Sequence, residues 1–154
     1  MEIQRPREVE VRESPDNYDA ELLLRLYELR RDEKLRRARE WLSGKFHADS
    51  MEEFEKQCPI GSEENALFRM AVSYWEMAAS LVNHGLIKED LFFENTGELW
   101  LTWEKVRQLA PEFREVRKNP VVWKNLETLA RKYEQWMATR APEALEVQRK
   151  RLKK

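Results

Sequence analysis

The stretch SEENALFRMAVSYWEMAASLVNHGLI, from Ser62 to Ile87, decides the fold. Apolar side chains cover nearly every side of a helix over about residues 63–84, and only a narrow polar stripe interrupts them. A helix this apolar normally lies at the centre of a protein. Ser62 is suited to cap its first turn, and Gly85 suits the left-handed position that ends a helix. The stretch therefore predicts a central helix at about residues 63–84.

Residues typical of helix ends divide the rest of the chain into further helices. All four glycines and most prolines fall where one helix would end and the next begin. Apolar stripes of helical spacing run over about residues 18–43 and through Pro111, where either one helix kinks or two helices share a face. Asn119 and Pro120 predict the start of the next helix. We expect an all-α fold, an irregular bundle of five to seven helices around the central one.

The length of 154 residues fits one domain. We expect a loose N-terminal arm over residues 1–14, a single helical domain over residues 15–140, and a polar C-terminal helix with a basic tail over residues 141–154. The first residues have no apolar segment of the kind that secretory signals carry. A single cysteine, Cys58, excludes an internal disulfide and a cysteine-rich zinc site. These features predict a cytoplasmic protein without a membrane span.

Charge is unevenly distributed along a chain whose net charge is only −1. Residues 45–98 carry 4 basic and 11 acidic side chains, a net charge of −7, whereas residues 99–154 carry 14 and 7, a net charge of +7. One interpretation is that these segments face each other within one chain or across a dimer. The other is a basic C-terminal surface that meets a polyanion, carried by Arg114, Arg117, Lys118, Lys124, Arg131 and Lys132.

No motif predicts catalysis, a metal or a cofactor. The scattered glycines build neither a phosphate-binding loop nor a dinucleotide fingerprint. Cys58 precedes a proline and has only two histidines in the chain as possible bases. The segment with His47, Asp49, Glu52 and Glu53 lacks the second histidine expected of a metal site. We therefore expect a protein that is not an enzyme and that needs no cofactor or metal.

Glu76 is the one acidic residue that the central helix sets between large apolar neighbours. A buried carboxylate there would act as an acid or base, or contact a ligand, with Arg69 nearby. The alternative is that both residues belong to the solvent-facing edge of the helix. Because the polar stripe continues for about four turns, the pattern favours the edge.

Three of the six tryptophans are candidates for exposure at an interface. Most of the tryptophans fit core stripes, but Trp100 lies off the stripe that begins at Leu99. Aromatic side chains are enriched at protein interfaces. We therefore name Trp75, Trp100 and Trp123, together with Arg69 and Glu76, as possible interface or ligand contacts.

Three segments in order carry a family resemblance: YWEMAASLVNHGLIKEDLFFE, then LWLTWEKVRQLAPEFREVR, then NPVVWKNLETLARKYEQW. A long apolar helix ending in Gly-Leu-Ile is followed by a short helix with an acidic start, a helix with tryptophan and proline, and a closing helix. This order resembles the bacterial helical proteins grouped as domain of unknown function 4760, over about half of the chain. The resemblance implies an all-α bacterial protein without an assigned activity, and it transfers no catalytic residue.

The function expected from these observations is a non-enzymatic protein-interaction module. It would associate with itself, as a dimer, or with another protein through helix faces rich in tryptophan and charge. The alternative is binding of a small ligand or a nucleic acid through the basic C-terminal half.

Overall fold

The computed structural model describes residues 15–153, and within that range the chain forms helices and no strand. The helices are α1 (Asn17–Arg30), α2 (Glu33–Gly44), α3 (Met51–Gln57), α4 (Glu63–Asn83), α5 (Glu89–Asn95), α6 (Glu98–Val106), α7 (Ala110–Val116), α8 (Lys124–Ala138) and α9 (Ala144–Leu152). The expected all-α class is confirmed. These nine described helices exceed the expected five to seven, because two apolar stripes are each divided between two helices.

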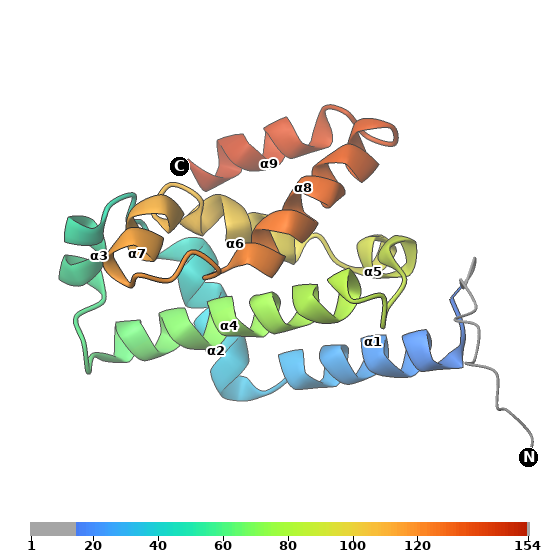
Figure 1. The fold of residues 1–154 in the computed structure, drawn as a ribbon, viewed down its shortest axis with the longest axis horizontal. Helices are drawn as coiled ribbons and strands as arrows, with labels where there is room; N and C mark the ends of the chain where they lie inside the picture. The colour runs from blue at the N-terminus through green and yellow to red at the C-terminus, as the bar shows by residue number, and fades with distance from the viewer. Residues whose placement is uncertain (1–14, 154) are drawn as a thin grey trace, which may run out of the picture.

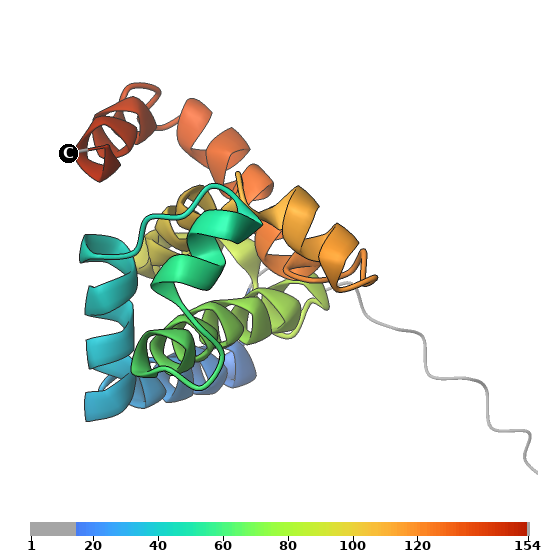
Figure 2. The ribbon, with the colours of Figure 1, turned by 90° about the vertical axis from the view of Figure 1, so that its left-hand side faces the viewer.

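Helix α4 is the centre of the bundle (Figure 1). Its contacts with α2 and with α8 are the most extensive between any two described helices. In both ribbon views α1 lies on one side of α4, and α9 lies on the opposite side (Figures 1 and 2). Because 10 of the 21 residues of α4 are buried, the expected central helix is confirmed.

Small and large side chains share the buried surface of α4. Ala71, Ala78 and Ala79 are fully buried, as is Ala38 of α2. Alanines let helix backbones approach closely, and Trp75 fills the space between them and the neighbouring helices with a fully buried ring. The helix packs on several sides because its apolar residues are not confined to one stripe.

An aromatic cluster closes the end of the bundle where α3 and α7 lie. The ring of Phe68 in α4 has its centroid 5.0 Å from that of Phe46, 4.9 Å from Phe54 and 5.8 Å from Trp123. Phe113 of α7 completes the cluster, with its centroid 4.5 Å from Trp123. These rings come from five separate segments, so the cluster holds distant parts of the chain together.

The helix expected over residues 18–43 is divided. Asp32 accepts a hydrogen bond from the Leu35 N–H at 3.1 Å and so caps a new helix, α2. Arg39 Nη1 donates to the Arg30 carbonyl oxygen at 3.3 Å. This hydrogen bond satisfies one of the carbonyl groups that have no partner within the helix at the end of α1. The chain therefore changes direction between α1 and α2 (Figure 1).

Pro111 separates two helices and does not kink one. Helix α6 ends at Val106, and Pro111 lies in the first turn of α7. The fixed φ of proline suits the helix there. The N–H groups of a first turn have no acceptor within the helix, so the missing N–H of proline costs no hydrogen bond. Leu109 and Ala110, both fully buried, keep the junction on the core.

The helix start predicted at Asn119 and Pro120 is misplaced, because α8 begins at Lys124. Asn119 Oδ1 accepts a hydrogen bond from the Val121 N–H at 3.1 Å and closes a turn in place of a helix cap. Trp123 then adopts a left-handed conformation with φ of +57° at the N-cap position. An indole has no acceptor for the free N–H groups of the first helical turn.

The ends of the chain are described in part. The N-terminal arm expected over residues 1–14 lies outside the described residues. The expected C-terminal helix corresponds to α9, which packs against α6 and α8. None of the described helices is both long and apolar enough to cross a bilayer.

Replacement of Phe68 by alanine removes the ring that touches three others in the aromatic cluster. We expect the free energy of unfolding to fall by about 3–5 kcal/mol, because a large buried ring leaves a cavity behind. Urea unfolding followed by tryptophan fluorescence measures the change. The control is Ile60→Ala, whose parent side chain is 96% exposed and whose loss should change stability by less than about 0.5 kcal/mol. A loss below about 1 kcal/mol for Phe68→Ala would contradict the role given to the cluster.

Candidate functional site

Glu76 of α4 caps the N-terminus of α8. Its Oε2 accepts a hydrogen bond from the Leu126 N–H at 2.7 Å, and its Oε1 accepts from the Asn125 N–H and from Asn125 Nδ2, both at 3.2 Å. The first turn of a helix leaves such N–H groups without a partner, and its dipole favours a negative charge. Glu76 is half-buried. The interpretation favoured by the sequence, that this residue simply faces solvent at the edge of the helix, is therefore corrected.

Arg69 and Trp123 lie at one shallow groove. With Met70 and Phe113 among its other lining residues, the groove encloses about 610 Å³ between α4 and the segment that leads into α8. Arg69 is exposed, and its Nε donates to Asn65 Oδ1 at 3.0 Å. The structure therefore brings two of the five candidate residues together, and Glu76 lies further along α4.

The exposure expected for Trp75, Trp100 and Trp123 is wrong, because all three side chains are buried. The Trp100 indole N–H donates to Glu134 Oε1 at 2.9 Å. Helix α6 contacts four other helices, so residues off its main apolar stripe are covered as well. Sequence periodicity assumes one buried face, and that assumption fails for a helix that is surrounded.

The basic residues of the C-terminal half are largely engaged by acidic side chains. Glu127 of α8 forms ion pairs with Arg114 at 2.9 Å, with Lys124 at 3.6 Å and with Arg131. Lys132 pairs with Glu89 at 3.0 Å, which joins the basic segment to the acidic one. Four of the six cations proposed for a polyanion surface thus have carboxylate partners within the chain. This arrangement does not favour nucleic-acid binding there.

Helix α1 is held to the body by two polar contacts, one of them buried. Asp19 Oδ1 accepts a hydrogen bond from the Lys88 N–H at 2.7 Å, just before α5. The Tyr74 hydroxyl of α4 donates to the Leu26 carbonyl oxygen at 2.6 Å. Burial is the main cause that raises the pKa of Tyr74 to about 12, so this hydroxyl stays a donor at neutral pH. The orientation of α1 is therefore fixed, and so is the face that it presents to solvent.

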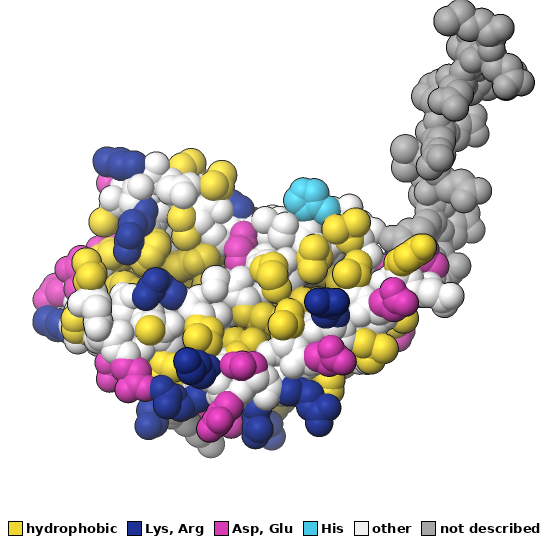
Figure 3. All heavy atoms as spheres, turned by 90° about the horizontal axis from the view of Figure 1, so that it is seen from below, with side chains coloured by type: hydrophobic (Ala, Val, Ile, Leu, Met, Phe, Trp, Pro, Cys, Tyr) yellow, Lys and Arg dark blue, Asp and Glu magenta, His cyan; other side chains and the backbone are white. Residues whose placement is uncertain are grey.

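That face is unusually apolar, and we call it the α1–α4 apolar face. Its large exposed side chains are Tyr18 (73% exposed) and Leu29 (47%) of α1, with Met70 and Met77 of α4. Leu24 and Tyr27 are also exposed, but they lie on another side of α1, where they line a small pocket with Phe92 of α5. The two methionines lie about one turn on either side of Tyr74, so they continue the surface of α1 onto α4. Figure 3 shows hydrophobic side chains gathered over the middle of this side, with many charged side chains along its lower margin. Apolar patches of this kind mark interaction sites.

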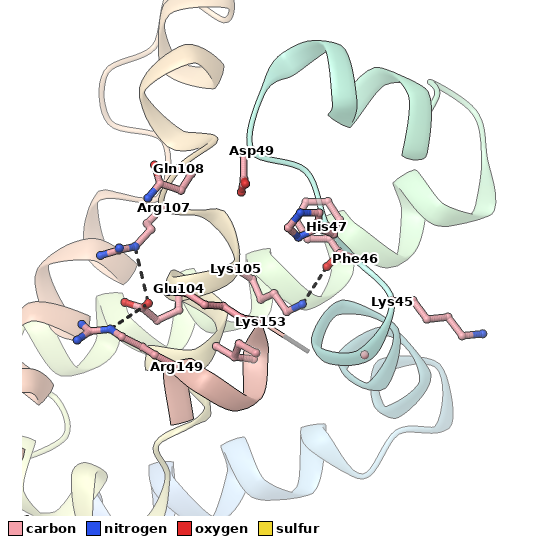
Figure 4. Close-up of a pocket in the computed structure, with 12 residues that line it drawn as sticks. Lys45, Phe46, His47, Asp49, Glu104, Lys105, Arg107, Gln108, Arg149 and Lys153 are labelled. Carbon is pink, nitrogen blue, oxygen red and sulfur yellow. Dashed lines mark hydrogen bonds and ion pairs between the residues drawn. The ribbon is translucent and has the colours of Figure 1, made fainter. Parts of the chain in front are cut away.

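A polar cavity of about 530 Å³ lies between the end of α2, the end of α6 and α9. We call it the α2–α6–α9 cavity, and its lining residues are Gly44, Lys45, Phe46, His47, Asp49, Glu104, Lys105, Arg107, Gln108, Arg149, Leu152 and Lys153. Five of these are lysine or arginine and two are acidic, so the lining is positive. Figure 4 shows His47, Asp49, Glu104 and Lys105 around one space, with Lys45 directed away from it.

Two interactions fix the walls of this cavity. Arg149 of α9 lies between Glu104, at 3.3 Å, and Glu134, at 3.0 Å. Lys105 Nζ donates to the Phe46 carbonyl oxygen at 2.9 Å. Burial lowers the pKa of Lys105, and the nearby charge of Asp49 offsets part of this effect. The cavity therefore contains a half-buried ammonium that has a neutral oxygen as its hydrogen-bond partner.

Groups suited to nucleophilic or metal chemistry are not gathered in the described part of the chain. Between residues 15 and 153, no three histidine, cysteine or acidic side chains lie close enough to hold a metal ion. Cys58 is buried, and burial followed by the charge of Glu64 raises the pKa of its thiol to about 11. A thiol with this pKa is a weak nucleophile at neutral pH.

Comparison with known proteins gives one match. The family model described as Domain of unknown function (DUF4760) matches residues 17–133. The chain belongs to this family. No curated protein and no solved structure matches the chain.

The DUF4760 match covers the two candidate surfaces unequally. Residues 17–133 include all of α1 and α4, so the α1–α4 apolar face lies wholly within the family domain. The α9 wall of the α2–α6–α9 cavity lies beyond it, since Arg149, Leu152 and Lys153 follow residue 133. The sequence signal that could have found the apolar face was the spacing of Tyr18 and Leu29, which stand about three turns apart on one side of α1.

Replacement of Glu76 by alanine leaves the first N–H groups of α8 without their acceptor. We expect the free energy of unfolding to fall by about 2 kcal/mol for Glu76→Ala, and by about half of that for Glu76→Gln, which keeps an acceptor oxygen. Urea unfolding measures both changes, with the exposed Glu55→Ala as the control. Equal stability of the Glu76→Ala and Glu55→Ala variants would show that the cap contributes nothing.

Glu127 makes stability depend on pH. Burial alone would raise its pKa, but its contact with Arg114 and the charges of Arg114, Arg131 and Lys124 hold the pKa of Glu127 below its usual 4.5. A carboxyl group whose pKa is lowered by folding stabilises the fold above its unfolded pKa, and that contribution is lost as pH falls through the folded value. We therefore expect Glu127→Gln to cost about 2 kcal/mol at pH 7 and progressively less below about pH 4.5.

Urea unfolding of both proteins at pH 7, 4.5 and 3 tests this expectation, with Glu55→Gln, an exposed change in α3, as the control. A stability difference between the native chain and Glu127→Gln that stays constant over these pH values would contradict it.

Proposed function

We propose that this DUF4760 protein is a non-enzymatic, self-associating interaction module that pairs through the α1–α4 apolar face. The observation that carries the proposal is the exposure of Tyr18 and Leu29 on one side of a helix that is anchored through Asp19 and Leu26. Covering large apolar side chains with another surface removes them from water and lowers the free energy of the protein. Adjacent exposed side chains of this kind therefore suit a binding partner.

The order of side chains along α1 suits a second copy of the same helix. Tyr18, Glu21, Arg25 and Leu29 follow one another at intervals of three or four residues, so they share one side of the helix. In an antiparallel pair related by a two-fold axis, Tyr18 of one copy faces Leu29 of the other. Glu21 faces Arg25, and each contact occurs twice. This complementarity favours a homodimer over an unrelated partner.

The size of the face indicates a weak to moderate dimer. Helix α1 has 14 residues and is about 21 Å long. A pair of such helices alone falls short of the roughly 1,200 Å² of a standard interface. The exposed Met70 and Met77 of α4 extend the surface, and methionine adapts its shape to a partner at low cost.

The chemistry of the candidate groups supports a non-enzymatic role. Both carboxylate oxygens of Glu76 already accept hydrogen bonds from the protein. The Cys58 thiol is buried and keeps its proton at neutral pH. We also propose a cytoplasmic location, which suits a chain whose one cysteine needs no disulfide partner.

Reversal of one charge on α1 should weaken the dimer. Glu21→Arg or Arg25→Glu alone places like charges opposite each other at two symmetric positions, and we expect about a tenfold rise in the dissociation constant. The double variant Glu21→Arg with Arg25→Glu restores opposite charges and should regain most of the affinity. Sedimentation velocity over a range of protein concentrations measures these constants.

The matched control reverses an exposed pair of the same spacing elsewhere. Glu52 and Lys56 of α3 form such an ion pair at 3.1 Å, so Glu52→Arg and Lys56→Glu should leave the dissociation constant unchanged. A monomer at all concentrations would contradict the proposal. A dimer whose dissociation constant is the same for the native chain and for the Glu21→Arg and Arg25→Glu variants would contradict the antiparallel arrangement.

A further inference from the structure

We infer that the shallow groove lined by Arg69, Phe113 and Trp123 binds an acidic peptide segment that carries an aromatic residue. The groove encloses about 610 Å³ between α4 and the segment that leads into α8, and we call it the α4–α8 groove. Small-molecule pockets usually bury most of their ligand, whereas a shallow groove suits a peptide of a partner protein. This inference goes beyond the proposed pairing through α1, because it concerns a different partner.

The apolar lining of the groove suits an aromatic side chain. Phe113 is partly exposed, and its ring centroid lies 4.5 Å from that of the buried Trp123. Met70 is exposed and also lines the groove. A thioether and a ring both make favourable contacts with an aromatic ring. A partner's aromatic side chain would therefore contact Phe113 and Met70.

Trp123 is held in place before any partner arrives. Its φ of +57° is a value that bulky side chains rarely adopt, so the position is strained. Contacts with Phe113 and with Phe68, whose centroid lies 5.8 Å away, keep the ring fixed in spite of this strain. A groove that is already formed loses little conformational entropy when a peptide binds.

The charge at the groove is positive. Of the described residues that line it, Arg69 alone is charged. Its Nε donates to Asn65 Oδ1 at 3.0 Å, and Asn65 Nδ2 donates to the Cys58 carbonyl oxygen at 3.0 Å. Because Asn65 is buried, these two hydrogen bonds orient the exposed guanidinium of Arg69. Its Nη1 and Nη2 groups make no hydrogen bond within the described residues, so they can donate to a partner's carboxylate.

Arg117 adds a second cation beside the groove. Its guanidinium carbon lies 5.0 Å from the centroid of the Phe113 ring. Between residues 15 and 153, neither Arg69 nor Arg117 forms an ion pair with a carboxylate. Two exposed cations without an acidic partner complement an acidic segment.

A single-stranded nucleic acid is the other anionic polymer that combines charge with flat rings. Its bases need exposed aromatic faces on which to stack. Phe68 and Trp123 are almost fully buried, so they offer no such faces. The groove therefore favours a peptide.

Isothermal titration of the full chain with the peptide acetyl-Asp-Asp-Phe-Asp-Asp-amide at low ionic strength tests the inference. We expect binding that weakens at least about tenfold when alanine replaces the phenylalanine, or when asparagine replaces the four aspartates. Higher salt should also weaken binding, since the cations are exposed. A single-stranded oligothymidylate should bind more weakly than the peptide.

Two variants of groove residues locate the site. Arg69→Gln removes the charge, and Ser73→Glu places a carboxylate four residues further along the same side of α4. Each should weaken peptide binding about tenfold. The matched controls are Ser73→Gln, which adds similar bulk without a charge, and Arg36→Gln at an exposed position of α2. Both controls should change the affinity by less than about twofold.

Sedimentation velocity of the same variants separates this groove from the dimer surface. Arg69 lies about 100° around α4 from Met70, since successive helical residues differ by that angle. Arg69→Gln should therefore leave the dimer dissociation constant within about twofold of the native value. The Glu21→Arg variant of α1 should bind the peptide as tightly as the native chain does.

Four results would overturn the inference. One is the absence of peptide binding at millimolar concentration. Another is equal affinity for the peptide and for its alanine or asparagine versions. The third is binding that neither Arg69→Gln nor Ser73→Glu weakens. The fourth is tighter binding of the oligothymidylate, which would assign the groove to a nucleic acid.

Discussion

The position of α8 depends on the carboxylate of Glu76. The indole of Trp123, the residue before α8, has no hydrogen-bond acceptor, so the N–H groups of Asn125 and Leu126 in the first turn rely on a carboxylate from α4. Further along α8, Glu134 accepts the Trp100 indole N–H and pairs with Arg149, which holds α9. The cap by Glu76 thus positions α8, and α8 in turn holds Arg149 of α9, which lines the α2–α6–α9 cavity.

The two candidate surfaces have opposite character and lie apart. Helix α1 is fixed by the polar contacts of Asp19 and Leu26, and it leaves large apolar side chains in water. The α2–α6–α9 cavity is polar, positive and built from a fixed loop and two helices. The exposed apolar side chains of α1 suit the surface of another protein.

The sequence predicts the parts of the fold that depend on near neighbours. The central helix, its cap at Ser62 and the left-handed Gly85 follow from residues a few positions apart, and the structure has all three. The burial of Trp100 and the cap by Glu76 depend on partners that are 34 and about 50 residues away. Spacing along one helix carries no signal for such partners, so Trp75 and Trp100 were placed correctly on helices but not relative to the surface.

Hydrogen–deuterium exchange of the native chain at two concentrations, one well below and one well above the dimer dissociation constant, tests the central claim most directly. Pairing through α1 predicts slower exchange at high concentration in the amides of α1 and in α4 around Met70 and Met77, and unchanged exchange in α3 and α9. Exchange that does not depend on concentration in α1, or protection confined to other helices, would contradict the account.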